Sequence, residues 1–388
     1  SFVFRYLILQ IATLNDYGKF ALFMSGFQTF IPFASFHTGH AIAVSYSSSK
    51  VESERTKWLK TSLFFSFVSS LLISSFALLV WDYDFLYAYI VPSKFFIFYS
   101  VALVIIAQGI MRGLLKPFSV SLLEMSLSIG RVLLLLIFIL FSRDNIRGIF
   151  LSFLFGNIIS VCIAIPIIIK RTNFILIRAI NWRETLAYTK KLIKFSIFIV
   201  FAQALTYGLH YVSRLSLSRL SYDNVAIYDA ALMLYNILRI GFTGIGLAVI
   251  PYASRKEDDS DKKLFPLKLI PFLYIFIIIL IVILKYTDLG LILLSLLQLR
   301  EYIEALPIFM VQLLVAPLEL FYVVGFNRLI GKRKTKQYFL TLLFVFPIHF
   351  LFVSIAAKSY GEIGVASVDI LTYLLLAGRM YWLNKKNI

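Results

Sequence analysis

The sequence is poor in cysteine and in charged residues. Its single cysteine, Cys162, lies within an apolar run of this 388-residue chain. An intrachain disulfide and a metal site built from several cysteines are therefore excluded. Charged residues make up 15% of the chain, against about 25% in soluble domains. The sequence also has no Gly-rich nucleotide-binding loop, so any driving energy would come from an ion gradient, the membrane potential or consumption of a product.

The sequence is instead rich in apolar residues. The chain is 60% hydrophobic and its mean hydropathy is +0.87. It contains repeated apolar runs of about 20 residues, the length that crosses a hydrocarbon core of roughly 30 Å. A β-barrel would need alternating segments of about 10 residues, and "LLLLIFILF" at 133–141 does not alternate. The sequence therefore predicts an all-α polytopic membrane protein.

Hydropathy predicts about twelve transmembrane helices, the first of them truncated at its start. They are expected at 1–14, 20–46, 59–80, 95–112, 118–141, 147–169, 193–213, 224–250, 266–286, 303–328, 336–357 and 361–383. A further short apolar stretch at 289–299 is expected at the membrane interface.

The loops alternate in charge, which predicts the orientation. Alternate connections such as 49–60 and 331–336 are rich in Lys and Arg. About 26 basic residues fall on that side and about 9 on the other, which makes the basic side cytoplasmic by the positive-inside rule. Both termini are then cytoplasmic in a cell membrane. The net charge of +18 is explained by contact with anionic lipid headgroups, and no nucleic acid is needed as a partner.

The longest basic connection divides the chain into two parts. We expect an N-terminal lobe of six helices, a basic amphipathic cytoplasmic linker along the membrane surface and a C-terminal lobe of six helices. Their limits are 1–169, 170–194 and 195–388.

The two halves resemble each other. "LNDYGKFAL" at 14–22 follows the first helix, and "LSYDNVAIYDAAL" at 220–232 follows the seventh. Two further pairs keep a similar shift: Arg112 with Arg328, and Gly148 with Gly364. An even number of spans in each half gives the two halves the same topology. Transporters with such repeats bind substrate between the halves and rock one half against the other.

Several segments, taken in order, resemble a known family. They include "LNDYGKFALFMSGFQTF" (14–30), "SRLSYDNVAIYDAALML" (218–234), "REYIEALPIFMVQLL" (300–314) and "YGEIGVASVDILTYLLL" (360–376). Together they are similar to the polysaccharide (oligosaccharide) flippases of the MOP superfamily, over essentially the whole chain. The resemblance implies two lobes around a central cavity and translocation of polyprenyl-pyrophosphate-linked oligosaccharides to the outer leaflet. Membrane lipids, a polysaccharide polymerase and glycosyltransferases are the further partners that it suggests.

Three arginines lie near the middle of predicted spans, where a charge is costly. Arg5, Arg131 and Arg239 are expected to line a cationic cavity, because the planar guanidinium binds phosphate oxygens in a bidentate manner. The resemblance supports Arg5 and Arg239, since lipid II flippases carry arginines in the first, second and eighth helices. The second helix departs from that pattern and has His37 and His40 instead. These two histidines are three residues apart, so they are expected to share a helix face and to contribute to the polar lining of the cavity. Pairing with a carboxylate is the alternative for each arginine.

Carboxylates within the spans are candidates for ion coupling. Glu124 lies seven residues before Arg131 and is its candidate partner. Glu319 follows Pro317, where a helix break would expose backbone carbonyls. Asp229 and Asp369 are expected near the outer surface and in contact with water. The histidines lack the further ligands of a metal site, so no metal or cofactor is expected.

Two other functions stay open. An ion-coupled exporter of small molecules, as in the MATE family, would use carboxylates in the first or seventh helix, and neither predicted span contains one. A membrane glycosyltransferase or polymerase would use the Asp82 and Asp84 pair of "WDYDF" to hold a metal and a sugar phosphate. Such enzymes need a large outer loop, which this sequence lacks, so a non-enzymatic flippase is favoured.

Overall fold

The structure is a computed structural model of the whole chain. It describes residues 2–36, 38–48, 52–80, 94–114, 117–141, 145–172, 182–254, 269–297 and 299–386. Asp82 and Asp84 lie outside these residues. The described residues form helices and short turns, without a β-strand among them.

The helices follow the predicted spans along the chain. They are α1 (Phe2–Ile11), α2 (Leu14–Ser35), α3 (Thr38–Ser48), α4 (Glu52–Val80), α6 (Lys94–Gly113), α7 (Pro117–Phe141), α8 (Asn145–Thr172), α9 (Trp182–Ser218), α10 (Tyr222–Ser254), α11 (Leu269–Tyr286), α12 (Leu289–Leu296), η4 (Arg300–Tyr302), α13 (Ala305–Gly331) and α14 (Thr335–Lys386).

Two predicted boundaries are wrong, and the last one is confirmed. The helix expected at 20–46 is two helices, α2 and α3, because Phe36 adopts a left-handed conformation with φ 46°. The last two predicted spans are two helices within α14 that meet at a kink at Gly361, where φ is 57° and ψ is −138°. The helix expected at 193–213 is longer at both ends, because α9 runs from Trp182 to Ser218 and takes in the end of the basic segment.

Length and hydropathy agree with a polytopic membrane protein. Six of the described helices are long and apolar enough to cross a membrane, or seven if the bent pair α11 and α12 counts as one span. That pair bends by 83°, so the apolar stretch predicted at 289–299 turns away from the direction of α11. Pro317 lies inside α13 without ending it, and the predicted helix break before Glu319 is therefore wrong.

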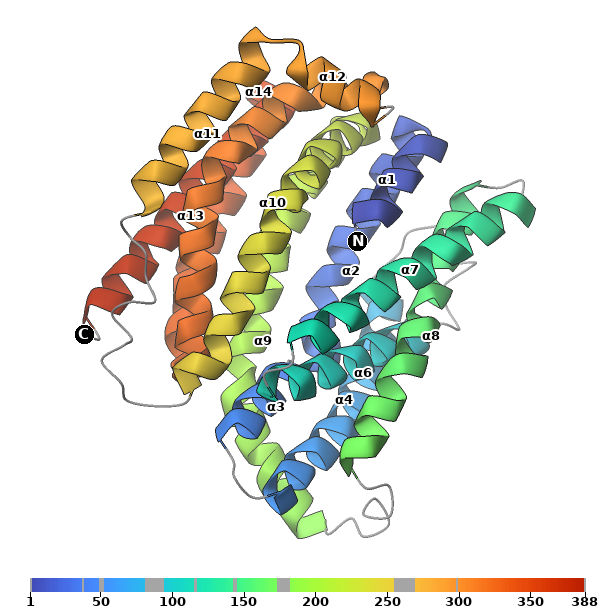
Figure 1. The fold of residues 1–388 in the computed structure, drawn as a ribbon, viewed down its shortest axis with the longest axis vertical. Helices are drawn as coiled ribbons and strands as arrows, with labels where there is room; N and C mark the ends of the chain where they lie inside the picture. The colour runs from blue at the N-terminus through green and yellow to red at the C-terminus, as the bar shows by residue number, and fades with distance from the viewer. Residues whose placement is uncertain are drawn as a thin grey trace.

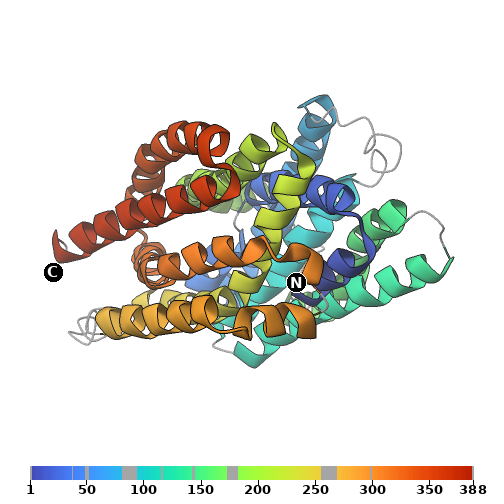
Figure 2. The ribbon, with the colours of Figure 1, turned by 90° about the horizontal axis from the view of Figure 1, so that it is seen from above.

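The helices form two groups. In Figure 1, α10 lies near the middle, with α11, α13 and α14 on one side and α1, α7 and α8 on the other. Figure 2 shows the same separation from above, with the orange and red helices at one side and the blue to green ones at the other. Helix α2 packs against α9 and α10 and so joins the groups.

The helix contacts repeat between the two halves of the chain. Helix α3 packs on α6 as α10 packs on α13, and α6 packs on α8 as α13 packs on α14. Helix α1 packs on α7 as α9 packs on α14. These matching contacts are those that the predicted sequence repeat requires. The domain limits at 169 and 195 stay a prediction.

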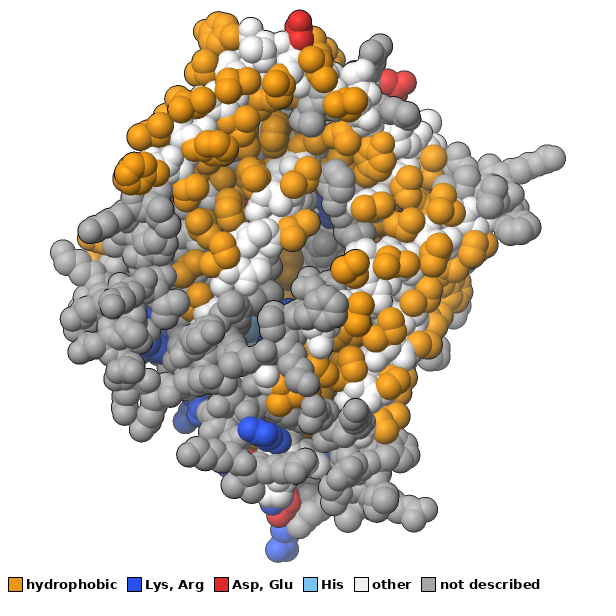
Figure 3. All heavy atoms as spheres, viewed as in Figure 1, with side chains coloured by type: hydrophobic (Ala, Val, Ile, Leu, Met, Phe, Trp, Pro, Cys, Tyr) orange, Lys and Arg blue, Asp and Glu red, His pale blue; other side chains and the backbone are white. Residues whose placement is uncertain are grey.

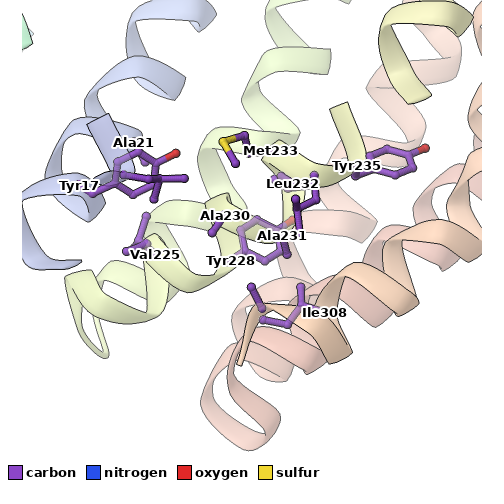
Figure 4. Close-up of a cluster of buried hydrophobic side chains, with 14 of the residues drawn as sticks. Tyr17, Ala21, Val225, Tyr228, Ala230, Ala231, Leu232, Met233, Tyr235 and Ile308 are labelled. Atoms are coloured by element: carbon purple, nitrogen blue, oxygen red, sulfur yellow. The ribbon is translucent and has the colours of Figure 1, made fainter. Parts of the chain in front are cut away.

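The starts of α2 and α10 cross at very short range. A Cβ atom on Gly18 would lie 1.9 Å from the backbone oxygen of Tyr222, and the ammonium of Lys19 lies 5.7 Å from the centre of the Tyr222 ring. These residues belong to the two similar sequence segments at 14–22 and 220–232. Behind the crossing, apolar and tyrosine side chains of α2, α10 and α13 form a continuous buried cluster (Figure 4).

The outer surface is apolar over most of its height. Hydrophobic side chains cover both groups of helices in Figure 3, and the basic side chains seen there gather mainly toward the lower end. Helix α11 exposes Phe272 and Phe276 to its surroundings. An apolar surface of this extent fits a lipid environment rather than water.

Candidate functional site

Asp229 is the centre of a buried ion cluster. Its carboxylate, 1% exposed, accepts hydrogen bonds from the Arg5 guanidinium at 3.1 and 3.2 Å and from the Tyr17 hydroxyl at 2.6 Å. Arg214 also pairs with it, through Nε at 3.0 Å and through Nη2. These groups come from α1, α2, α9 and α10, so one carboxylate connects four helices. The expectation that Asp229 is in contact with water is wrong.

Glu319 is the centre of a second cluster. Its carboxylate, 2% exposed, pairs with Arg239 Nε at 2.6 Å, whereas the Arg239 side chain is 29% exposed. The hydroxyls of Tyr235 and Tyr373 donate to it at 2.7 and 3.3 Å. The carboxylate is thus enclosed, while the Arg239 side chain is partly exposed.

His210 of α9 joins the two clusters. An arginine only donates hydrogen bonds, so Nε2 of His210 accepts the 3.1 Å bond from Arg239. The backbone oxygen of His210 accepts a 3.1 Å bond from Arg214. A chain of polar contacts therefore runs from Glu319 through His210 to Asp229.

The polar chain extends across the depth of α10. At 1.5 Å per residue, Asp229 lies about 10 Å and Arg239 about 25 Å from the start of that helix. Arg5 lies about 9 Å from the end of α1, nearer that end than predicted because α1 stops at Ile11.

A third carboxylate, Asp369, is bound by neutral donors. Tyr228 donates to it at 2.7 Å and Gln312 at 2.6 Å. Near it, His349 bonds to Thr372 at 2.8 Å. Asp369 is buried, so its predicted contact with water is wrong as well.

The remaining arginine lies between α7 and α8. Arg131 donates a 2.9 Å hydrogen bond to Asn157 and lies 4.3 Å from the centre of the Phe153 ring. Its candidate partner from the sequence, Glu124, has a side chain outside the described ones. Arg131 is at the depth that the sequence predicted, about 21 Å from the start of α7.

Arginines outnumber carboxylates in this interior. Among the described side chains, four arginines lie with three carboxylates. Figure 3 shows a hollow between the two groups of helices with blue side-chain atoms inside it. Among the described side chains, this interior therefore carries one more formal positive charge than negative.

Of the two histidines in the second predicted span, the structure describes only His40. His40 is buried in α3, and His37 lies outside the described residues. Their common helix face stays a prediction, because α2 ends before His37 and α3 begins after it. No group of three His, Cys, Asp or Glu side chains fit for a metal occurs in the part of the chain that the structure describes.

Sequence reasoning missed Arg214, His210 and the tyrosines. Arg214 was placed one residue beyond the predicted end of its helix, where it looked like an ordinary loop cation. Tyrosines are common in membrane helices, so nothing singled out Tyr17 or Tyr235. Asp229 could have indicated a buried arginine partner, because it lies seven residues into α10 within a largely apolar run.

The long apolar helices define a polytopic α-helical membrane protein. The family described as polysaccharide biosynthesis protein matches residues 1–257. This is more than half of the chain, and the protein belongs to that family. No protein with a curated description matches the sequence.

Solved structures show the same fold at low identity. A MOP superfamily transporter from Pyrococcus furiosus superposes with a TM-score of 0.72 at 13% identity, over 99% of this chain and 90% of that one. An inward-facing MATE family multidrug transporter gives 0.71 at 12%, over 99% and 93%. The MATE transporter VcmN of Vibrio cholerae gives 0.68 at 14%, over 99% and 91%. These chains establish the MATE fold.

Proposed function

We propose that this protein is a flippase that moves polyprenyl-pyrophosphate-linked oligosaccharides from the cytoplasmic to the outer leaflet. Membership of the polysaccharide biosynthesis protein family and the MATE fold support a membrane transporter. The single observation that carries the substrate class is the excess of buried arginines. A cation in a membrane interior is costly unless it is paired, and an anionic headgroup would supply the missing charge.

Arg239 is the proposed first contact for the pyrophosphate. Its side chain is partly exposed while its partner Glu319 is enclosed. Nε is bound to the carboxylate, and Nη2 bonds to His210. A phosphate oxygen that replaces His210 would give the guanidinium a charged acceptor in place of a neutral imidazole.

Arg5 and Arg214 are proposed to couple substrate to movement. Both bind Asp229, and Arg5 belongs to the first half of the chain while Arg214 and Asp229 belong to the second. A diphosphate that competes with Asp229 for Arg5 would weaken a link between the halves. Rocking of one half against the other would then expose the site to the opposite side.

We infer the orientation from the loop charges. The basic side, which carries the starts of α4 and α9, lies in the cytoplasm of a cell membrane. The oligosaccharide then enters from the side on which it is made, next to glycosyltransferases, and leaves toward a polymerase.

An ion-coupled exporter of small molecules is the second candidate. The MATE neighbours and the buried carboxylate Asp369, which has neutral donors, favour it. Against it, Asp229 and Glu319 are each paired with arginine, which leaves little capacity for a cation.

A translocation assay in liposomes tests the proposal. The purified protein is reconstituted with a fluorescent polyprenyl-pyrophosphate oligosaccharide, and the fraction that an external sugar-binding protein reaches is followed over time. We expect transport by the wild type and a loss of tenfold or more in Arg239→Gln. A wild type that leaves the lipid in place but releases a small organic cation would replace the flippase by the exporter.

A further inference from the structure

Two hydrogen-bond donors between α7 and α8 are left without acceptors. Because Arg131 only donates, Asn157 must turn its amide oxygen toward it, and the amide nitrogen then points elsewhere as a donor. That nitrogen and Nε of Arg131 are buried, and neither has a hydrogen-bond partner. A buried donor without an acceptor costs about 1–3 kcal/mol. Both atoms are donors, so an acceptor oxygen between α7 and α8 would satisfy them.

The surrounding residues hold this pair rigidly. Arg131 is 8% exposed and Asn157 1%. The guanidinium stacks on Phe153, which in turn packs edge-on against Phe27 of α2. On the other side, a Cβ atom on Gly156 would lie 2.4 Å from Cγ of Arg131, so the glycine makes room for the arginine. The donors are thus fixed in place rather than free to find other partners.

The charge of Arg131 also has no counter-ion among the side chains that the structure describes. No carboxylate pairs with it among the described side chains, and Arg5, the charged group that acts on it, repels it. Helix α1, which carries Arg5, lies between α10 and α7 in Figure 1 and packs on both. A carboxylate or phosphate oxygen would satisfy both the charge and the two donors.

We propose that Arg131 and Asn157 form a second anion subsite, which binds an acidic oxygen of the transported headgroup. This inference rests on the proposed function for the identity of the cargo. The oxygen has two sources of the same chemistry: the carboxylate of an acidic sugar, or the pyrophosphate itself.

Two substitutions separate a binding role from a structural one. Asn157→Asp places a carboxylate beside Arg131 and fills the subsite from within. We expect it to melt at or above the wild-type temperature and yet to bind acidic cargo at least tenfold more weakly. Arg131→Gln should lose binding to the same degree. Ser160→Ala is the matched control, because Ser126 donates to Ser160 between the same two helices at 3.4 Å away from the subsite.

The readout is binding of three cargoes to the purified full chain in nanodiscs. A lipid-linked neutral oligosaccharide, its uronic-acid counterpart and inorganic pyrophosphate are titrated against each variant. A loss confined to the uronic-acid cargo assigns the subsite to the sugar carboxylate, and an equal loss for all three assigns it to the phosphates. Both results support the proposal. Wild-type affinities in Asn157→Asp overturn it, whether or not Arg131→Gln folds.

The same titration distinguishes this proposal from the flippase proposal. If the wild type binds a soluble uronic-acid oligosaccharide or pyrophosphate through Arg131 but moves no lipid-linked sugar, only the flippase assignment fails. If it moves the lipid and the two variants do so equally well, only the subsite fails.

Discussion

Asp229 shows how this membrane protein accommodates charge. Its carboxylate faces two guanidinium groups and a phenol, and each arginine has further donors directed elsewhere. Such a cluster contributes little net stability when complete, but removing one member leaves a buried charge unpaired. The side chain is therefore sensitive to substitution even though it touches no solvent.

We predict that Asp229→Asn lowers the free energy of unfolding by about 3–5 kcal/mol, because Arg5 and Arg214 lose their carboxylate. Thermal unfolding in detergent measures it. The control is Glu184→Gln, which removes the pair with Lys57 at 3.1 Å, where both side chains are over 40% exposed. That change should cost under about 1 kcal/mol, and equal effects at the two sites would contradict the account.

Glu319→Gln is predicted to strengthen anion binding. The amide removes the charge that competes for Arg239 but keeps the shape and an acceptor for Tyr235. We expect inorganic pyrophosphate to bind several-fold more tightly, with a lower melting temperature. Isothermal titration measures the affinity. Weaker binding in this variant would mean that Arg239 needs Glu319 to hold it and does not meet the anion.

At the residue scale, the sequence placed the arginines within helices, but their role in binding stays a prediction. For Arg5 and Arg239 the structure shows the alternative, pairing with a carboxylate. Arg5, Arg131 and Arg239 stand out because a charge within an apolar run is costly and so carries information. Carboxylates near a predicted helix end do not stand out in this way. An error of a few residues in the predicted boundary moves such a residue from the membrane into water. Asp229 and Asp369 were misplaced for that reason, and Arg214 was missed by one residue.

Among the elements, α14 has a turn that only glycine adopts readily. Gly361 has φ 57° and ψ −138°, outside the regions open to residues with a Cβ. We predict that Gly361→Ala costs about 1–3 kcal/mol. Gly378→Ala in the same helix is the control, since a Cβ there meets nothing within 4 Å. Thermal unfolding of both variants checks the difference, and a tolerated Gly361→Ala would refute the bend.

The crossing of α2 and α10 gives a second prediction for an element. A Cβ on Gly18 would collide with the backbone oxygen of Tyr222, which has no flexible end to move away. Gly18→Ala should therefore destabilise the protein by about 1–3 kcal/mol. Gly241→Ala in α10, where nothing lies within 4 Å, should instead stabilise it by up to about 1 kcal/mol. Similar melting temperatures for the two variants would contradict the close crossing.

The elements themselves were largely predictable, because a membrane span needs a long apolar run. Hydropathy does not show where a helix is broken within an apolar run. The break at Phe36 falls within apolar sequence and was missed, whereas the kink at Gly361 falls at the predicted boundary between the last two spans. The continuation of α9 to Trp182 was also missed, because its first turns carry charges that hydropathy counts as loop.

For the whole molecule, the two similar halves of the sequence predicted the repeated helix contacts, whereas the domain limits stay a prediction. The sequence did not predict the net charge of the interior, because that depends on which side chains pair across helices. Asp229 draws its partners from α1, α2 and α9, positions up to 224 residues apart in the chain. Only the fold brings them together, and the excess of arginine follows from it.

The central claim is that this excess recognises a pyrophosphate, and an affinity comparison tests it most directly. The full chain in nanodiscs is titrated with one polyprenyl-linked oligosaccharide carried on a pyrophosphate and with the same compound carried on a monophosphate. We predict that the wild type binds the pyrophosphate at least tenfold more tightly and that Arg239→Gln loses this preference while it remains folded. Equal affinities for the two compounds in the wild type would contradict the account.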